Sequence, residues 1–196
     1  NLFFSKKNKS EIDAFIITTP AISHFFYLKK IIKINKPMII EKPLIQNLKE
    51  YKNLKTMKKK LLKKKILVNH SDLYSSGFLK IKPYLKSIEP IKQVEMIFGK
   101  YQKKYKNELP YFDWLPHPIG IYCYLFGKPS KVKIKTNKIF EKNNYKFQDL
   151  HFLLERNNIK AKIHFSNNFK KPHRIVKIIG AKGSLVYNGY SKNNLF

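Results

Sequence analysis

One lysine in this sequence lies where a protein could use it for chemistry. The triplet Glu41-Lys42-Pro43 follows the short apolar run of residues 37–40, which has the composition of a buried parallel strand. Parallel sheets bind ligands at the carboxyl ends of their strands, so this position favours a ligand-contacting role for Lys42. The alternative is one more solvated charge, because lysine occurs throughout the chain.

Asp113 and His117 form a second candidate group. Their spacing of four residues at the start of a predicted helix brings the two side chains near one another. Histidine exchanges protons near neutral pH, so the pair is a candidate site for proton transfer. The alternative is structural, since Asp is an ordinary helix-start residue and a lone His often serves as a cap or in packing.

Several ring-bearing side chains accompany these groups. Aromatic faces pack well on the C–H surfaces of sugars, so these rings could shape a sugar pocket, although packing in the core explains them equally well. The rings belong to His70, Tyr74, Tyr111 and Trp114.

Hydrophobic periodicity indicates how the first candidate is positioned. Short apolar runs alternate with segments whose apolar residues recur every three or four positions, and Ser23 and Asn47 are suited to cap two of the helices. This order is typical of parallel βαβ units. We therefore expect residues 1–90 to be the C-terminal half of a doubly wound, Rossmann-type dinucleotide-binding domain.

The pattern changes after Pro90. Residues 159–165 alternate strictly between apolar and polar side chains, which predicts an open, mainly antiparallel sheet with one wet face. The pair Asn157-Asn158 is suited to a tight hairpin turn, and Gly127 to a helix C-cap. The predicted fold class is therefore α/β plus α+β, and residues 91–196 are expected to form the α+β domain.

Composition limits the compartment and the partners. The single Cys123 allows no internal disulfide, and no apolar stretch approaches the roughly 18 residues that span a bilayer, so we expect a cytoplasmic protein without a membrane partner. The net charge is +29, yet Arg156 and Arg174 are the only arginines among 41 basic residues. Specific groove readers depend on arginine. The dispersed lysines therefore predict a solvated surface rather than a specific nucleic-acid site.

Four segments, spread in order from residue 13 to residue 188, resemble the Gfo/Idh/MocA family of oxidoreductases. In the first, a strand ending in Thr-Pro precedes a helix with His and then Glu-Lys-Pro; later come Asp-x-x-x-His and Ile-x-Gly-x-x-Gly. The segments are DAFIITTPAISHFFYLKKIIKINKPMIIEKPL, VNHSDLYSSGFLKIKPYL, DWLPHPIGIYCYLFGKPSKV and IVKIIGAKGSLVYN. The resemblance implies NAD or NADP as cofactor, and hydride transfer at a hydroxyl or keto carbon of a sugar, nucleotide sugar or polyol.

The resemblance also implies roles for individual residues. Lys42 would hydrogen-bond the reacting hydroxyl and the nicotinamide ribose, and His117 would be the acid/base. Asp113 would contact a substrate hydroxyl and set the electrostatics around His117, and Trp114 and His70 would line the substrate. No metal is expected. Residues expected to contact the cofactor are Thr18, Thr19, Pro20, His24, Glu41, Lys42 and Pro43.

Two departures from the family pattern bear on these expectations. The sequence contains no Gly-x-Gly-x-x-Gly turn for the pyrophosphate. By the usual length of βαβ units, about 60 residues are expected to precede Asn1, and they would also hold the residue that selects NAD or NADP. In addition, Gly120 stands where the family usually carries an acidic residue, so the exact substrate does not carry over.

Two functional classes remain open from the sequence. The first is the oxidoreductase, which we expect to form a homo-oligomer through the open face of its second sheet. The second is a catalytically inactive, truncated relative that serves as an association or polyanion-binding module.

Overall fold

The computed structural model describes residues 12–106 and 109–191, and the chain divides into two compact units, Asn1–His70 and Ser71–Phe196. The sequence placed the boundary near residue 90, twenty residues later. The difference lies in helix α4 (Ser76–Ile88), which we expected on the dinucleotide-binding domain. Its Phe78 and Ile81 are fully buried in the hydrophobic core of the second unit. The helix therefore belongs to the second unit.

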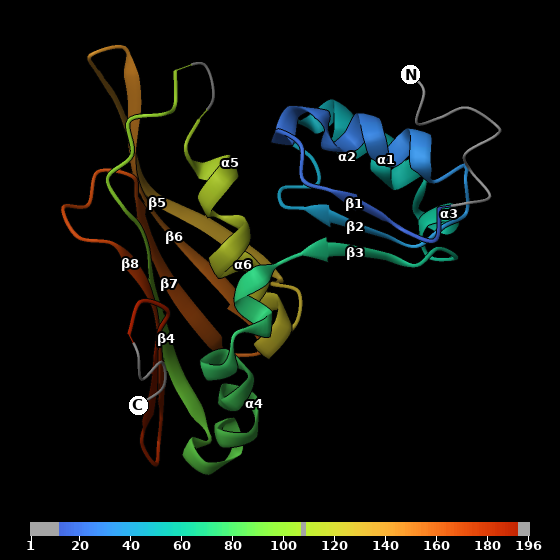
Figure 1. Ribbon diagram of the computed structural model, residues 1–196. Helices are drawn as coiled ribbons and strands as arrows, with labels where there is room; N and C mark the ends of the chain where they lie inside the picture. The colour runs from blue at the N-terminus through green and yellow to red at the C-terminus, as the bar shows by residue number, and fades with distance from the viewer. Residues whose placement is uncertain (1–11, 107–108, 192–196) are drawn as a thin grey trace. The chain divides into compact units, whose positions relative to one another are not determined.

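A parallel sheet in the order β1-β2-β3 forms the centre of the first unit. Its strands are β1 (Phe15–Ile17), β2 (Met38–Glu41) and β3 (Ile66–Asn69). The intervening helices are η3 (Ala21–Ser23), α1 (His24–Ile31), α2 (Leu48–Thr56) and α3 (Lys58–Leu61). Figure 1 shows α1 and α2 over the same face of this sheet. The predicted alternation of parallel strands and helices is confirmed for this unit.

The core of the first unit follows from the period of two along its strands. Ile17, Met38 and Ile40 are buried with Phe25 and Leu28 of α1. The residues between them in sequence face the other way: Ile16 is 73% exposed and Ile39 is 39% exposed. Within the described residues, the helices therefore cover one face of this sheet.

The two predicted helix caps have different outcomes. Asn47 caps α2 as expected, because its Oδ1 accepts a hydrogen bond from the backbone N–H of Glu50 at 2.9 Å. The prediction that Ser23 caps α1 is wrong. Within the described residues its side chain accepts no capping hydrogen bond. Its hydroxyl lies 2.7 Å from Thr19 Oγ1 and 2.8 Å from Pro20 O. The short helix η3 already occupies the turn before α1, so its backbone leaves no open N-terminus for Ser23 to cap.

The second unit is built on a six-stranded sheet in the order β5-β6-β7-β4-β8-β9. Neighbouring strands run antiparallel except β4 and β7, so the sheet is mixed although mainly antiparallel. Figure 1 shows α4, α5 (Tyr111–Trp114) and α6 (Pro116–Phe126) on one side of this sheet. The strands are β4 (Ile91–Gly99), β5 (Lys131–Lys142), β6 (Tyr145–Arg156), β7 (Ile159–Ser166), β8 (His173–Gly180) and β9 (Ser184–Asn188).

Turn chemistry in this unit agrees with the sequence. Asn157 and Asn158 adopt the predicted positive φ angles, 47° and 66°, between β6 and β7. Gly127 ends α6 with φ 82°. The sequence analysis missed a second pair of this kind, Asn143-Asn144, which turns the chain between β5 and β6.

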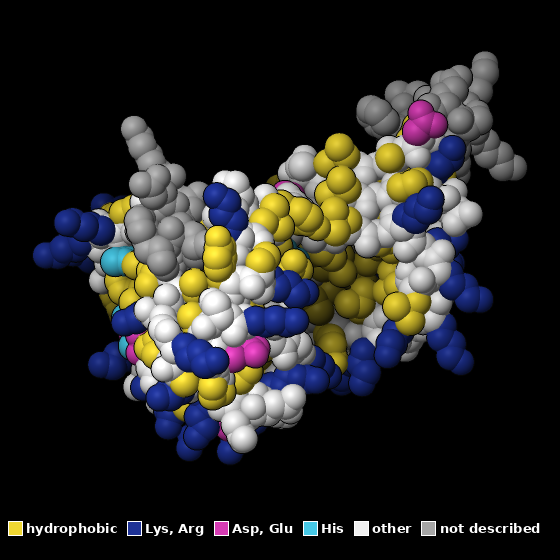
Figure 2. Space-filling model, turned by 90° about the horizontal axis from the view of Figure 1, so that it is seen from below, with side chains coloured by type: hydrophobic (Ala, Val, Ile, Leu, Met, Phe, Trp, Pro, Cys, Tyr) yellow, Lys and Arg dark blue, Asp and Glu magenta, His cyan; other side chains and the backbone are white. Residues whose placement is uncertain are grey.

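One face of the second sheet carries the core and the other is polar. On β6 and β7 the residues Phe152, Leu154 and Ile163 are buried, whereas His151 and His164, on the opposite face, are partly exposed. The predicted wet face is therefore present. Figure 2 shows lysine and arginine side chains scattered over the face in view rather than gathered in one patch. None of the described helices is long and apolar enough to cross a membrane.

Candidate functional site

The Glu-Lys-Pro triplet lies at the carboxyl end of the parallel sheet, as the sequence predicted. Glu41 is the last residue of β2 and pairs in register with Asn69, the last residue of β3. Asn69 Nδ2 donates a hydrogen bond to Glu41 Oε1 at 2.5 Å, which ties the two strand ends together. Lys42 follows, half-buried, and the Lys42–Pro43 peptide bond is cis. The sequence analysis did not single out Asn69, although its place at the end of a predicted strand was a usable signal.

His24 positions the chain around this triplet. The ring is 2% exposed, with Nδ1 2.8 Å from Pro43 O and Nε2 2.7 Å from Thr19 O. It therefore connects the loop after β1 to the loop after β2. Each ring nitrogen therefore lies within 2.8 Å of a backbone carbonyl oxygen.

The remaining predicted cofactor contacts lie at the same end of the sheet. Thr18 and Pro20 are exposed and Thr19 is half-buried, immediately after β1, and His70 follows β3 directly. The structure thus collects the predicted residues of the first unit where open α/β sheets bind ligands.

His117 of the second unit has a carboxylate partner, but it is Asp72 rather than the expected Asp113. His117 Nδ1 lies 2.5 Å from Asp72 Oδ2, and both side chains are buried, at 7% and 3% exposure. Arg174 of β8 donates from Nη1 to the other oxygen, Asp72 Oδ1, at 2.9 Å. A helix, a turn of 3₁₀ helix (η4, Ser71–Tyr74) and a strand thus meet at one carboxylate.

The surroundings keep Asp72 ionised. Burial by itself raises the pKa of this carboxyl, but the hydrogen bonds and charges of His117 and Arg174 outweigh it, so the net pKa lies below the usual value. An ionised carboxylate only accepts hydrogen bonds, so Nδ1 of His117 must carry the proton between them. Nε2 makes no hydrogen bond within the described residues. In the neutral ring it is therefore the nitrogen that can accept a proton.

Asp113 has a different set of neighbours. Its Oδ2 accepts from Tyr105 Oη at 2.9 Å and from Lys104 Nζ at 2.6 Å. Trp114, which is buried, donates from Nε1 to Gln102 Oε1 at 3.0 Å, and its ring centroid lies 6.1 Å from that of His117. The four-residue spacing does not run along one helix, because Asp113 lies on α5 and His117 on a separate helix, α6.

The two missed residues had weak sequence signals. Asp72 stands inside the segment VNHSDLYSSGFLKIKPYL, and Arg174 is one of two arginines in the chain. Neither belongs to a local motif with His117, from which they are 45 and 57 positions away.

Of the other predicted rings, Tyr74 is 57% exposed and Tyr111 is half-buried against Phe112, with ring centroids 4.3 Å apart.

The geometry of the first unit defines a class, the dinucleotide-binding α/β proteins. Residues 5–70 match the model of the oxidoreductase family with the NAD-binding Rossmann fold, Gfo/Idh/MocA. Over this segment the match confirms the resemblance that the sequence motifs indicated. No curated protein sequence matches the chain.

Solved structures share the fold over nearly the entire chain. A protein from Magnetospirillum magnetotacticum MS-1, named as a candidate oxidoreductase, superposes with a TM-score of 0.84 at 24% identity, covering 97% of this chain and 64% of that one. Biliverdin reductase from Synechocystis sp. PCC 6803, solved with biliverdin and NADP+, gives 0.77 at 19% identity, covering 100% and 66%.

A third solved structure is UDP-N-acetylglucosamine 3-dehydrogenase from Acidithiobacillus ferrooxidans, with a TM-score of 0.73 at 16% identity, covering 92% of this chain and 58% of that one. At these identities the likeness is one of fold. The chain spans less than two thirds of the length of each of these solved proteins.

Proposed function

We propose that the protein containing this chain is an NAD(P)-dependent oxidoreductase that acts at a hydroxyl or keto carbon of a sugar, nucleotide sugar or polyol. The observation that carries the proposal is the family match over residues 5–70, which includes the Glu-Lys-Pro triplet at the carboxyl end of β2. Hydride acceptance belongs to the nicotinamide, while the protein supplies orientation and a proton acceptor.

The proposed reaction uses Lys42 of the first unit and His117 of the second. Oxidation of an alcohol removes a hydride from carbon and a proton from oxygen, so the oxygen gains negative charge as the proton leaves. The ammonium group of Lys42 would stabilise that charge. His117 would accept the proton at Nε2, the nitrogen that Asp72 leaves deprotonated by holding Nδ1–H. In the direction of reduction the same groups work in reverse.

The arrangement around His117 favours an alcohol or ketone as the substrate. A buried histidine oriented by an ionised carboxylate is suited to exchanging a proton with an oxygen of moderate basicity, as in acyl-transfer enzymes that orient a base in this way. A sugar or polyol offers several such oxygens. The name of one structural relative, a nucleotide-sugar dehydrogenase, agrees with this substrate class.

Steady-state kinetics of the protein with its complete dinucleotide-binding domain tests the proposal. Lys42→Met should lower kcat by on the order of 10²-fold or more, because the amine acts on charge that develops in the transition state. Lys49→Met, at an exposed position at the start of α2, is the matched control and should leave kcat unchanged.

His117→Ala should also lower kcat and change its pH profile, because the group that accepts the proton is deleted. A Lys42→Met variant with turnover close to that of the wild type would contradict the role of the lysine. Absence of any NADH or NADPH binding by the intact protein would contradict the proposed activity as a whole.

A further inference from the structure

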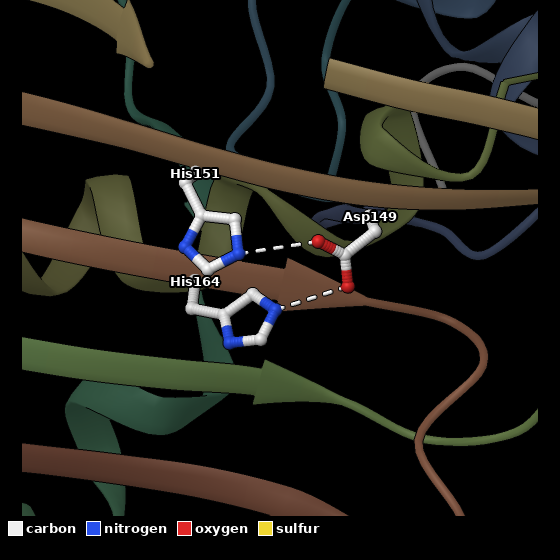
Figure 3. A group of neighbouring side chains, drawn as sticks. All are labelled: Asp149, His151 and His164. Carbon is white, nitrogen blue, oxygen red and sulfur yellow. Dashed lines mark hydrogen bonds and ion pairs between the residues drawn. The ribbon is translucent and has the colours of Figure 1, made fainter. Parts of the chain in front are cut away.

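Three side chains converge on the polar face of the second sheet, opposite the face that carries the core. Figure 3 shows the imidazoles of His151 and His164 both directed at the carboxylate of Asp149. His151 Nε2 lies 3.2 Å from Asp149 Oδ1, and His164 Nε2 lies 3.1 Å from Asp149 Oδ2. The two rings stack with centroids 3.8 Å apart.

The register of the sheet produces this convergence. Asp149 and His151 are two residues apart on β6, so they project from the same face. His164 on β7 is the direct cross-strand partner of His151. Both strands have a paired neighbour on each side, β5 beyond β6 and β4 beyond β7. The backbone that carries all three side chains is therefore held by sheet hydrogen bonds on every side, which limits the cost of ordering them.

The spacing of the donor atoms is close to that required by a metal ion. One candidate ligand atom from each residue can be chosen so that all lie within 4.8 Å of one another. Ligand atoms at about 2.0–2.1 Å from a tetrahedral zinc ion lie about 3.4 Å apart. Both contacts between histidine and carboxylate are already near that separation. On metal binding the widest separation, at most 4.8 Å, therefore has to shrink to about 3.4 Å.

The chemistry of the donors selects the kind of ion. Calcium and magnesium require several oxygen ligands, and this cluster offers a single carboxylate. Glu95, Lys135 and Lys162 line the same surface hollow as the two histidines, so the charged neighbours add no net negative charge that would hold a hard cation. Two neutral imidazoles with one carboxylate are a set that zinc, cobalt, nickel and copper bind well. The side chains are between 28% and 45% exposed, so an ion can enter from solvent.

We propose that Asp149, His151 and His164 form a mononuclear site for a divalent transition-metal ion of the zinc class, with the remaining coordination positions open to water or to a further ligand. No metal was expected from the sequence, and only the register of β6 and β7 brings these three residues together. The site shares no residue with the groups proposed for the oxidoreductase reaction and does not depend on that activity.

His173 is a matched control for the proposed site. It lies on β8 of the same sheet, and the ring of Phe169 contacts both His164 and His173 edge-on, each at a centroid distance of 4.8 Å. His173 is thus a neighbouring histidine that is not part of the cluster. A general affinity of surface histidines for metal would involve His173 as much as the other two.

The experiment uses the untagged chain after removal of metal with a chelator. Titration with Co²⁺, followed by its visible absorption, should show one ion bound per chain, and Zn²⁺ should displace it. His151→Asn, His164→Asn and Asp149→Asn should each weaken binding by about tenfold or more, a conservative figure because supporting residues alone contribute that much. His173→Asn should bind within about twofold of the wild type.

Fluorescence of Trp114 in urea checks that the variants remain folded, and a second measurement on the wild-type chain does not depend on them. Paramagnetic Co²⁺ should broaden the imidazole NMR signals of His151 and His164 before that of His173. The proposal fails if the wild-type chain binds no Co²⁺ at micromolar concentrations, if His173→Asn weakens binding as much as the cluster variants, or if a thiolate charge-transfer band shows Cys123 to be the ligand.

Discussion

Replacing Asp72 with Asn tests the buried contact that organises the second unit. The change removes a negative charge and keeps the shape of the side chain. The amide oxygen can still accept one hydrogen bond, but the amide nitrogen then donates, so it no longer fits the second of the two donors, His117 Nδ1 and Arg174 Nη1. His117 can restore that contact only by moving its proton to Nε2.

The Asp72→Asn change should lower both stability and turnover, and the effect on turnover should be the larger. Leaving a buried donor or charge without its partner costs about 1–3 kcal/mol of unfolding free energy, and we take the middle of that range, about 2 kcal/mol, because Arg174 is 25% exposed and keeps some solvation. The effect on turnover is larger, because a histidine with its proton on Nε2 cannot accept another there. The equivalent change in a serine protease lowers kcat by about 10⁴-fold through the wrong tautomer.

Urea unfolding followed by the fluorescence of Trp114 measures the first effect in the second unit, since this tryptophan is the only one in the chain and is buried there. Asp113→Asn is the control. Asp113 and its partner Lys104 are 33% and 52% exposed, and exposed pairs contribute about 0–1 kcal/mol. The asparagine keeps a side-chain oxygen that can accept the hydrogen bond from Tyr105 Oη.

The pH dependence supplies the refuting result. The pKa of Asp72 is lower in the folded state than in the unfolded state. Its contribution to the unfolding free energy is therefore fully present above the unfolded-state pKa of about 3.9 and is lost as the pH falls through the folded-state pKa. The difference in unfolding free energy between the wild type and Asp72→Asn should therefore become smaller below about pH 4. An equal difference at neutral and at strongly acidic pH, or an effect no larger than that of Asp113→Asn, would refute the reasoning.

Three further predictions concern the second unit. Gly99→Ala should lower the unfolding free energy of the second unit by about 3 kcal/mol or more, measured by the fluorescence of Trp114 in urea. The φ angle of Gly99 is +140°, and an added Cβ would approach Ser166 O to 1.9 Å. A loss below about 1 kcal/mol would contradict this prediction. Burial raises the pKa of Cys123, so iodoacetamide should label it more slowly in the native chain than in urea, and equal rates would contradict that burial. The intact protein should be a homo-oligomer by light scattering, because the open sheet face offers a surface for association; a monomer at high concentration would count against this.

Local patterns in the sequence determined most of the elements and one half of the candidate site. Apolar runs of strand length, helical spacing and the cap at Asn47 predicted the parallel βαβ order of the first unit. The asparagine pair 157–158 correctly predicted a hairpin turn, and Gly127 correctly predicted the end of a helix. Both rest on positive φ angles, which depend on single residues. The placement of Lys42 at a strand's carboxyl end follows from the same local information.

Only the tertiary structure decided which partners these elements and side chains have. Helix α4 carries an ordinary apolar stripe, and nothing in that stripe specifies which unit covers it. Asp72, His117 and Arg174 are far apart in sequence and meet because η4, α6 and β8 pack together. In the same way, Asp149, His151 and His164 converge through the register of two strands. Periodicity records which face of an element is apolar, whereas the identity of the neighbour is set by long-range packing, which no local pattern contains.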